Sequence, residues 1–316
     1  MSDTPHLSEP VGLRLVLGGN VFGWTADQET SFAVLDAFYA AGGRMIDTAE
    51  GYSDWIPGHK GGESETVLGA WMAARGNRAD MHIATKTGMY GKPGDLSPSK
   101  VAAAVDGSLK RLQTDYIDLY YAHRDEAETP LADVVAGFDA LVRAGKVRTV
   151  GASNYSAERL GEARRLAREA GQTGFAAIQN EYNLVVRDQF EGPVQALCVS
   201  EGIASFPYFG LCSGFLTGKY RTSTDLEGSS RGYRVKEYLE VGLPILAAMD
   251  KVAAETGASL AHIALAWINA QPGIAAPIAS ASRPEQVADL AAGAALTLSP
   301  EHVALLNAAK ALPKDA

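Results

Sequence analysis

Four side chains that can exchange protons lie at or just after the ends of short apolar segments in this sequence. Asp47 ends one segment and Tyr52 follows it, while Lys86 and His123 end the next two segments. Each has an ordinary structural interpretation when taken alone, because an Asp often caps a turn, a Lys is usually solvated and a Tyr usually packs in a core. Four titratable side chains at successive segment ends instead indicate one shared chemical role.

A phenol beside an ammonium group can donate a proton to an oxygen that becomes negatively charged. The phenol of Tyr52 keeps its proton at neutral pH, since its unperturbed pKa is about 10. We expect the ammonium of Lys86 to lower that pKa by roughly 1–3 units, and Asp47 to hold Lys86 charged and oriented. We expect His123 to bind the substrate oxygen. Such a set suits carbonyl reduction, in which a hydride added to carbon is matched by a proton added to oxygen.

The elements that must position these groups are eight short apolar segments that alternate with longer helical ones. This alternation predicts parallel strands, and eight of them favour an α/β fold of the (β/α)8 type, a single-domain TIM barrel. In that fold the carboxyl ends of all strands meet at one rim, where active sites lie. We expect residues 1–10 to be a flexible N-terminus and residues 11–316 to form the barrel. The predicted strands are 13–19, 44–49, 81–86, 116–123, 149–154, 176–180, 203–208 and 274–280.

Several helix boundaries carry their own signals. Thr25 followed by Gln28 predicts a capping box, and Ser97 before Pro98 predicts an N-cap with proline in the first turn. Ser156 and Ser282 are predicted to cap two further helices. The longest gap between strands is predicted to hold helices over 240–256 and 260–270.

Six short segments, taken in order, resemble those of the aldo-keto reductase superfamily. Segments 47–52, 84–86 and 123–130 resemble its catalytic segments, and 151–154, 179–183 and 214–220 resemble its cofactor-binding segments. The resemblance extends over about residues 13–290 and is to bacterial-type, NADPH-dependent members, in the branch that includes reductases like the potassium channel β subunits. It implies reduction of aldehydes or ketones to alcohols with NADP(H), with Asp47, Tyr52, Lys86 and His123 as the catalytic set and Tyr52 as general acid.

The resemblance also implies a cofactor site without the glycine fingerprint of doubly wound folds, which this chain lacks. Gly19, Asn20, Val21 and Asp47 would lie near the nicotinamide, with Ser153, Asn154 and Gln179 holding its carboxamide and Tyr208 stacking on its ring. Phe209, Gly210, Leu211, Ser213, Lys219 and Arg231 would pass beside the pyrophosphate and ribose. The adenosine 2′-phosphate would meet Ser280, Ser282, Arg283 and Gln286, which favours NADP(H) over NAD(H).

Two positions depart from the family pattern. Glu126 stands where relatives usually carry Asp, which should alter a loop contact and not the chemistry. Leu290 stands where relatives often carry an Asn that meets the adenine, so that hydrogen bond is lost. For the substrate we expect an apolar or sugar-stacking wall at the rim, formed by Trp24, Trp55 and Tyr90 together with His123.

Composition limits the partners of the chain. A net charge of −9 over 316 residues disfavours nucleic acid, since a phosphate backbone would be repelled. No apolar run approaches the ~20 residues of a membrane span, and two cysteines without zinc spacing predict neither a metal site nor an oxidising compartment. We expect a cytoplasmic monomer or weak homo-oligomer acting on a small carbonyl compound. Two alternatives remain: an NADPH-binding redox sensor or regulatory subunit with little turnover, and a barrel isomerase acting on sugar phosphates.

Overall fold

The computed structural model describes residues 12–90, 94–228 and 232–311. It contains eight parallel strands in one sheet, in the order β7-β6-β5-β4-β3-β2-β1-β8. Each strand therefore pairs with its neighbours in the chain, and β1 also pairs with β8. The strands are β1 Val16–Gly18, β2 Met45–Asp47, β3 His82–Thr87, β4 Ile117–Ala122, β5 Val147–Ser153, β6 Ala177–Gln179, β7 Ala204–Ser205 and β8 Ile278–Ala279.

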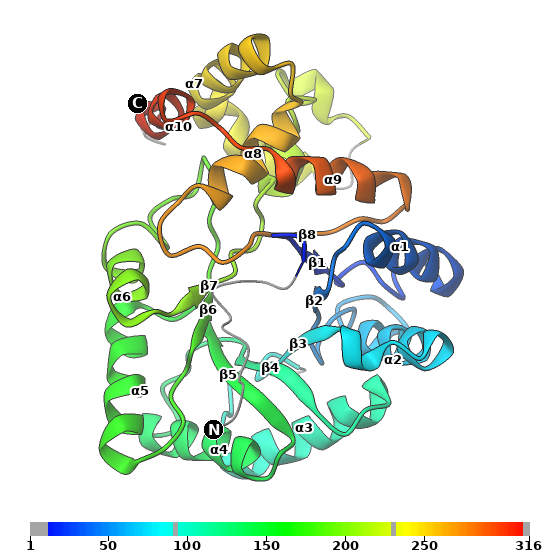
Figure 1. The fold of residues 1–316 in the computed structure, drawn as a ribbon, viewed down its shortest axis with the longest axis vertical. Coiled ribbons are helices and arrows are strands. Elements are labelled where there is room, and N and C mark those ends of the chain that lie inside the picture. The colour runs from blue at the N-terminus through cyan, green and yellow to red at the C-terminus, as the bar shows by residue number, and fades with distance from the viewer. Residues whose placement is uncertain (1–11, 91–93, 229–231, 312–316) are drawn as a thin grey trace.

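The two ends of this sheet meet and close it into a barrel. Ser205 in β7 forms a parallel bridge with Ile274, just before β8. The N–H of Ala275 donates to the Ser205 oxygen at 2.9 Å, and the N–H of Ser205 donates to the Gly273 oxygen at 3.2 Å. Figure 1 shows the helices arranged around the outside of the curled sheet. The predicted (β/α)8 barrel is confirmed.

All eight predicted strands are present, but most are shorter than predicted. The shortest are β7 and β8, with two residues each. Pro207 follows β7 and Pro277 precedes β8, and a proline has no N–H to donate to a neighbouring strand. Those two prolines limit the regular pairing at the place where the barrel closes.

Ten α-helices are assigned in the described parts of the chain, and the barrel helices follow their strands. The helix predicted over 240–256 is longer than expected, because α7 begins at Gly232. It also contains a proline, Pro244. The helices are α1 Gln28–Ala40, α2 Glu63–Arg75, α3 Pro98–Leu112, α4 Leu131–Arg143, α5 Ala157–Ala170, α6 Pro193–Glu201, α7 Gly232–Thr256, α8 Leu260–Asn269, α9 Glu285–Ala295 and α10 Pro300–Ala308.

Two of the predicted helix caps are wrong and two are confirmed. Ser97 and Ser156 are N-caps as predicted. The cap of α1 is Asp27, whose carboxylate accepts the N–H of Thr30 at 2.8 Å, and not Thr25, which lies two residues too early. Ser282 is also no cap, because α9 begins only at Glu285.

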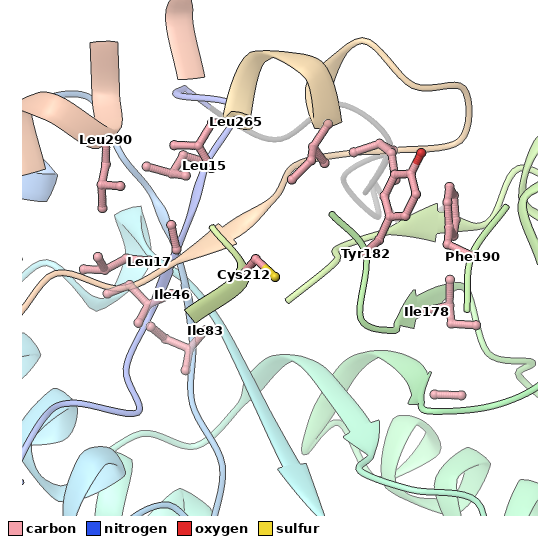
Figure 2. Packing of buried hydrophobic residues seen from close by; sticks show 14 of the residues in the cluster. Leu15, Leu17, Ile46, Ile83, Ile178, Tyr182, Phe190, Cys212, Leu265 and Leu290 are labelled. Atoms are coloured by element: carbon pink, nitrogen blue, oxygen red, sulfur yellow. The ribbon is translucent and has the colours of Figure 1, made fainter. Parts of the chain in front are cut away.

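Side chains of successive strand residues point alternately into the barrel and outward to the helices. The inner cluster includes Ala84 of β3, whereas Ile83 belongs to the outer cluster between sheet and helices. Figure 2 shows Leu17, Ile46 and Ile83 side by side on the outer face of β1, β2 and β3. Lys86 therefore shares the inward side of β3 with Ala84.

Two sequence-based expectations concern residues that the structure does not describe. Residues 1–10 and Arg231 lie outside the described ranges, and the division into residues 1–10 and 11–316 stays a prediction.

Within residues 12–90, 94–228 and 232–311, none of the helices combines the length and the apolar character that crossing a bilayer requires. The same ranges contain no cluster of three or more His, Cys, Asp or Glu side chains able to hold a metal ion.

Candidate active site

The predicted catalytic residues meet at the carboxyl ends of neighbouring strands. Asp47 is the last residue of β2, Lys86 is the penultimate residue of β3, and His123 directly follows β4. Tyr52 lies in a turn of the loop after β2. Its backbone N–H donates to the backbone oxygen of Ala49 at 3.2 Å. Parallel pairing of β2 with β3 and of β3 with β4 brings these positions to one rim.

Lys86 is the centre of a buried hydrogen-bond network. Its ammonium donates to Asp47 Oδ2 at 2.6 Å, to the Tyr52 hydroxyl at 2.8 Å and to the Thr48 backbone oxygen at 2.8 Å. The Tyr52 hydroxyl in turn donates to Asp47 Oδ2 at 3.2 Å. The side chain of Lys86 is fully buried and that of Asp47 is 2% exposed. All three ammonium hydrogens are thus used, which fixes the group in place.

The electrostatics of this network differ from the sequence-based expectation. Burial, followed by the negative charge of Asp47, raises the pKa of Tyr52 well above its usual value. Burial lowers the pKa of Lys86, and Asp47 offsets part of that effect. The predicted lowering of the Tyr52 pKa by Lys86 is therefore wrong for this structure. Asp47 neutralises the ammonium and also accepts from the phenol, so both effects favour a protonated Tyr52.

His123 lies against the tyrosine with one ring nitrogen unpaired. The ring centroids of His123 and Tyr52 are 6.2 Å apart at an interplanar angle of 72°. Nδ1 of His123 is buried without a hydrogen-bond partner in the described residues. Burial, followed by the charge of Lys86, holds the pKa of His123 well below its usual value. At neutral pH the ring is therefore uncharged, with one N–H to donate.

Three amide and hydroxyl side chains predicted to hold a carboxamide lie beside this network. The Ser153 hydroxyl donates to the Gln179 backbone oxygen at 2.7 Å, and Nδ2 of Asn154 donates to Ser153 Oγ at 3.0 Å. Gln179 Nε2 donates to Asp47 Oδ1 at 2.8 Å, which joins this set to the network around Lys86. The Tyr208 hydroxyl donates to Asn154 Oδ1 at 2.7 Å and so fixes the orientation of that amide.

The loop after β7 has an unusual backbone. Phe209, Cys212 and Ser213 have positive φ values of 57°, 49° and 55°, which non-glycine residues seldom adopt. The N–H groups of Cys212 and Gly214 donate to the backbone oxygens of Phe209 and Leu211 at 2.7 and 2.9 Å, so they are not free for an anion. Lys219 folds back over this loop, since a Cβ added at Gly214 would lie 3.7 Å from its Nζ. Its ammonium is therefore the candidate phosphate contact of this loop.

Arg234 is a candidate cofactor contact that the sequence analysis missed. Its guanidinium lies 4.6 Å from the centroid of the Phe209 ring, beside the loop after β7. Arg234 lies in the first turn of α7, six residues before position 240, where the helix was predicted to begin. A better estimate of that helix start would have placed its positive charge next to the cofactor segment.

The segment predicted to meet the adenosine end is only partly as expected. The N–H groups of Ser282 and Arg283 both donate to Oε1 of Gln286, at 2.9 and 3.2 Å, so they are not free for an anion. The guanidinium of Arg283 is exposed and has no ion pair among the described residues. The Ser280 hydroxyl donates to Asn20 Oδ1 at 2.6 Å, which connects β8 with the loop after β1.

The two departures from the family pattern are structurally simple. Leu290 is buried in the outer core, as Figure 2 shows, and has no polar atom to offer an adenine. The Glu126 carboxylate accepts the backbone N–H groups of Leu96, Glu128 and Thr129. Glu126 therefore organises its loop, which agrees with the expected loop contact.

Two of the three predicted aromatic wall residues extend from Tyr52. The Tyr52 and Trp55 ring centroids are 6.3 Å apart, and those of Trp55 and Trp24 are 5.7 Å apart with nearly perpendicular rings. Trp24 is 40% exposed and Trp55 is 52% exposed, so both present apolar surface at the rim. Tyr90 does not join them, because its hydroxyl donates to the Lys60 backbone oxygen and its ring lines a separate cavity.

Comparison with known proteins agrees with this geometry. A family model described as the Aldo/keto reductase family matches residues 14–311. The chain is 33% identical to an aryl-alcohol dehydrogenase (NADP(+)) of Phanerodontia chrysosporium, over 90% of this chain and 76% of the relative. It is 32% identical to the aldo-keto reductase YhdN of Bacillus subtilis (strain 168), over 95% and 89%. It is 30% identical to a probable voltage-gated potassium channel subunit beta of Oryza sativa subsp. japonica, over 85% and 83%. The chain belongs to the aldo/keto reductase family.

Proposed function

We propose that this protein is an NADPH-dependent reductase that converts aldehydes or ketones to alcohols, with Tyr52 as the general acid. The observation that carries the proposal is the buried contact of the Tyr52 hydroxyl with Lys86 Nζ at 2.8 Å, beside the neutral ring of His123. A proton donor, a charge that stabilises its conjugate base and a second hydrogen-bond donor are thus present together at the barrel rim.

The residues of the site divide the work of reduction. A bound nicotinamide would supply the hydride to the carbonyl carbon. The uncharged His123 would donate its N–H to the carbonyl oxygen and polarise it. Tyr52 would give its proton to that oxygen as negative charge develops, and the ammonium of Lys86 would hold the resulting phenolate. In alcohol oxidation Tyr52 would act as the base.

The high pKa of Tyr52 has a consequence for this scheme. A phenol that stays protonated is available as a donor over a wide pH range, but its phenolate is costly to form. Lys86 lies in direct contact with the phenol oxygen and is the group that reduces this cost. We therefore propose that turnover depends on Lys86 remaining charged.

We propose NADP(H) as the cofactor because of the exposed charge of Arg283 near the end of β8. Replacing Arg283 with Ala should weaken NADPH binding by roughly tenfold or more, since a charged hydrogen bond to phosphate contributes about 1.5–3 kcal/mol. NADH binding should change little, because NADH has no 2′-phosphate. Fluorescence titration of both cofactors against both proteins measures this. A wild-type preference of tenfold or more for NADH would contradict the assignment.

We propose that the wall of Trp24 and Trp55 favours aromatic carbonyl substrates, and the aryl-alcohol dehydrogenase relative supports this choice. Trp55→Ala should raise KM for an aromatic aldehyde by roughly 3–10-fold, since an aromatic pair contributes about 0.5–1.5 kcal/mol beyond its buried area. KM for a short aliphatic aldehyde should stay within about twofold, because such a substrate lacks a ring to stack. Equal increases for both aldehydes would show that Trp55 supports the loop and does not select the substrate.

A regulatory role is the second candidate, because one relative is named as a probable potassium channel subunit. Turnover of a simple aldehyde with NADPH separates the two functions, since a sensor would bind NADPH and turn over little.

We further propose a cytoplasmic protein that is a monomer or a weak homo-oligomer. The two cysteines, Cys198 and Cys212, are buried and unpaired, which is consistent with a reducing compartment.

A further inference from the structure

The two threonines that flank Lys86 are both held by buried acids. Thr85 and Thr87 lie on the outward side of β3, opposite to Lys86. The Thr85 hydroxyl donates to Glu65 Oε1 at 2.6 Å, and the Thr87 hydroxyl donates to Glu50 Oε1 at 2.7 Å. Strand β3 is therefore hydrogen-bonded to acids outside the barrel at the residues directly before and directly after Lys86.

Glu65 is the more unusual of the two acids. It lies in the first turn of α2 and its side chain is fully buried. Its second oxygen, Oε2, accepts a hydrogen bond at 2.6 Å from Nε of Arg111, a residue near the end of α3. Burying a carboxylate is unfavourable unless it is paired and hydrogen-bonded. Glu65 meets that condition, with a hydroxyl on one oxygen and a guanidinium on the other.

Two glycines of α2 and its N-cap leave room for Arg111. A Cβ added at Gly62 would lie 2.4 Å from Arg111 Cδ, and one added at Gly69 would lie 2.2 Å from the Arg111 backbone oxygen. Both glycines flank Glu65 along α2 and its N-cap. Larger residues at these places would push α3 and its guanidinium away from Glu65. The ion pair thus depends on several features of the local sequence.

We infer that Glu65 is a positioning residue for Lys86: through Thr85 it holds β3 in place, and its charge, balanced by Arg111, keeps the ammonium of Lys86 protonated. The inference rests on the proposed role of Lys86 in proton transfer. It assigns Glu65 no contact with substrate or cofactor.

Charged and titratable groups lie on both sides of β3 around Lys86. On the inward side are Asp47 of β2, Tyr52 of the loop after β2, Tyr121 of β4, which is the strand partner of Lys86, and His123 at the end of β4. Glu65 of α2, which is paired with Arg111 of α3, lies on the outward side and acts on Lys86 through its charge. Burial lowers the pKa of Lys86, while Asp47 and then Glu65 raise it. Asp47 also accepts hydrogen bonds from Tyr52 and Gln179. Glu65 is therefore the second anion that favours the ammonium.

The test uses two substitutions with opposite expected signs. Glu65→Gln removes the negative charge and leaves Arg111, so the pH above which Lys86 loses its proton should fall by about 0.5–1 unit. Arg111→Gln removes the compensating positive charge, so that pH should rise. Thr85→Val removes only the hydroxyl that Glu65 holds. With this variant kcat should fall, and the pH at which Lys86 loses its proton should not change. A purely structural role predicts loss of activity in all three variants without opposite shifts.

Two measurements report the result. The first is the alkaline limb of kcat against pH for aldehyde reduction with saturating NADPH. The second is the 13Cε shift of Lys86 in lysine-labelled protein, assigned by its loss in Lys86→Met, which needs no turnover. Opposite shifts in the NMR titration support the inference even if wild-type turnover is absent, in which case only the proposed function fails.

The inference is overturned if Lys86 titrates at the same pH in wild type and in both folded charge variants. It is also overturned if both variants shift in the same direction. Should Glu65→Gln not fold, Arg111→Gln and Glu65→Asp take its place. Glu65→Asp retains the charge and should leave the titration within about 0.3 pH units of wild type, because only the charge is required.

Discussion

Tyr52→Phe should lower kcat for carbonyl reduction by about 10²–10⁴-fold and leave NADPH affinity within about twofold of wild type. The substitution removes only the hydroxyl that contacts Lys86 at 2.8 Å and Asp47 at 3.2 Å. The ring and its edge contacts with Trp55 and His123 remain, so the pocket keeps its shape. The loss should therefore fall on proton transfer, which steady-state kinetics and fluorescence titration with NADPH measure separately.

The matched control is Tyr39→Phe, which removes a hydroxyl that donates to Asp80 at an exposed site on α1. This control should keep kcat within about twofold, because the change lies outside the rim. Near-normal turnover of Tyr52→Phe would remove Tyr52 from its role as general acid. A large loss of NADPH affinity would instead indicate that the hydroxyl organises the cofactor site.

Lys86→Met should both abolish turnover and destabilise the fold. Methionine fills similar volume but leaves the Asp47 carboxylate buried without its cation, and breaking a buried ion pair typically costs about 3–5 kcal/mol. The proton donor would also lose the charge that stabilises its phenolate, so kcat should fall by at least about 10²-fold. Chemical denaturation and kcat measurements test the two effects on the same protein.

The double variant Asp47→Asn with Lys86→Met separates stability from chemistry. It removes the unpaired charge, so most of the lost free energy of unfolding should return, while kcat should stay low. Recovery of both quantities would show that Lys86 serves only to neutralise Asp47. Lys86→Met with the free energy of unfolding of wild type would show that the ion pair contributes nothing to the fold.

Much of the fold was predictable because its signal is local. Each strand is a short apolar segment, and the carboxyl ends of parallel strands necessarily share a rim. The positions of Asp47, Lys86 and His123 at three strand ends therefore sufficed to bring them together. Ser97 and Ser156 were correct caps for the same reason, since a cap acts within one helical turn.

The errors arose where two local signals competed or where the contact was distant. Thr25 and Asp27 are both good caps, and only the position of the first helical turn selects Asp27. Arg234 was missed because the start of α7 was placed too late, and Tyr90 was placed at the rim because its loop begins there. Its hydroxyl instead meets Lys60, thirty residues earlier in the chain.

By itself the sequence determined which chemical groups the barrel presents at its rim, because strand order and strand ends follow from local patterning. Only the tertiary structure decided how those groups titrate. The pKa of Tyr52 is raised and not lowered, because burial and the negative charge of Asp47 both raise it. The ion pair of Glu65 and Arg111 joins residues 46 positions apart in the chain. Burial and long-range charge depend on packing, which no short segment of sequence specifies.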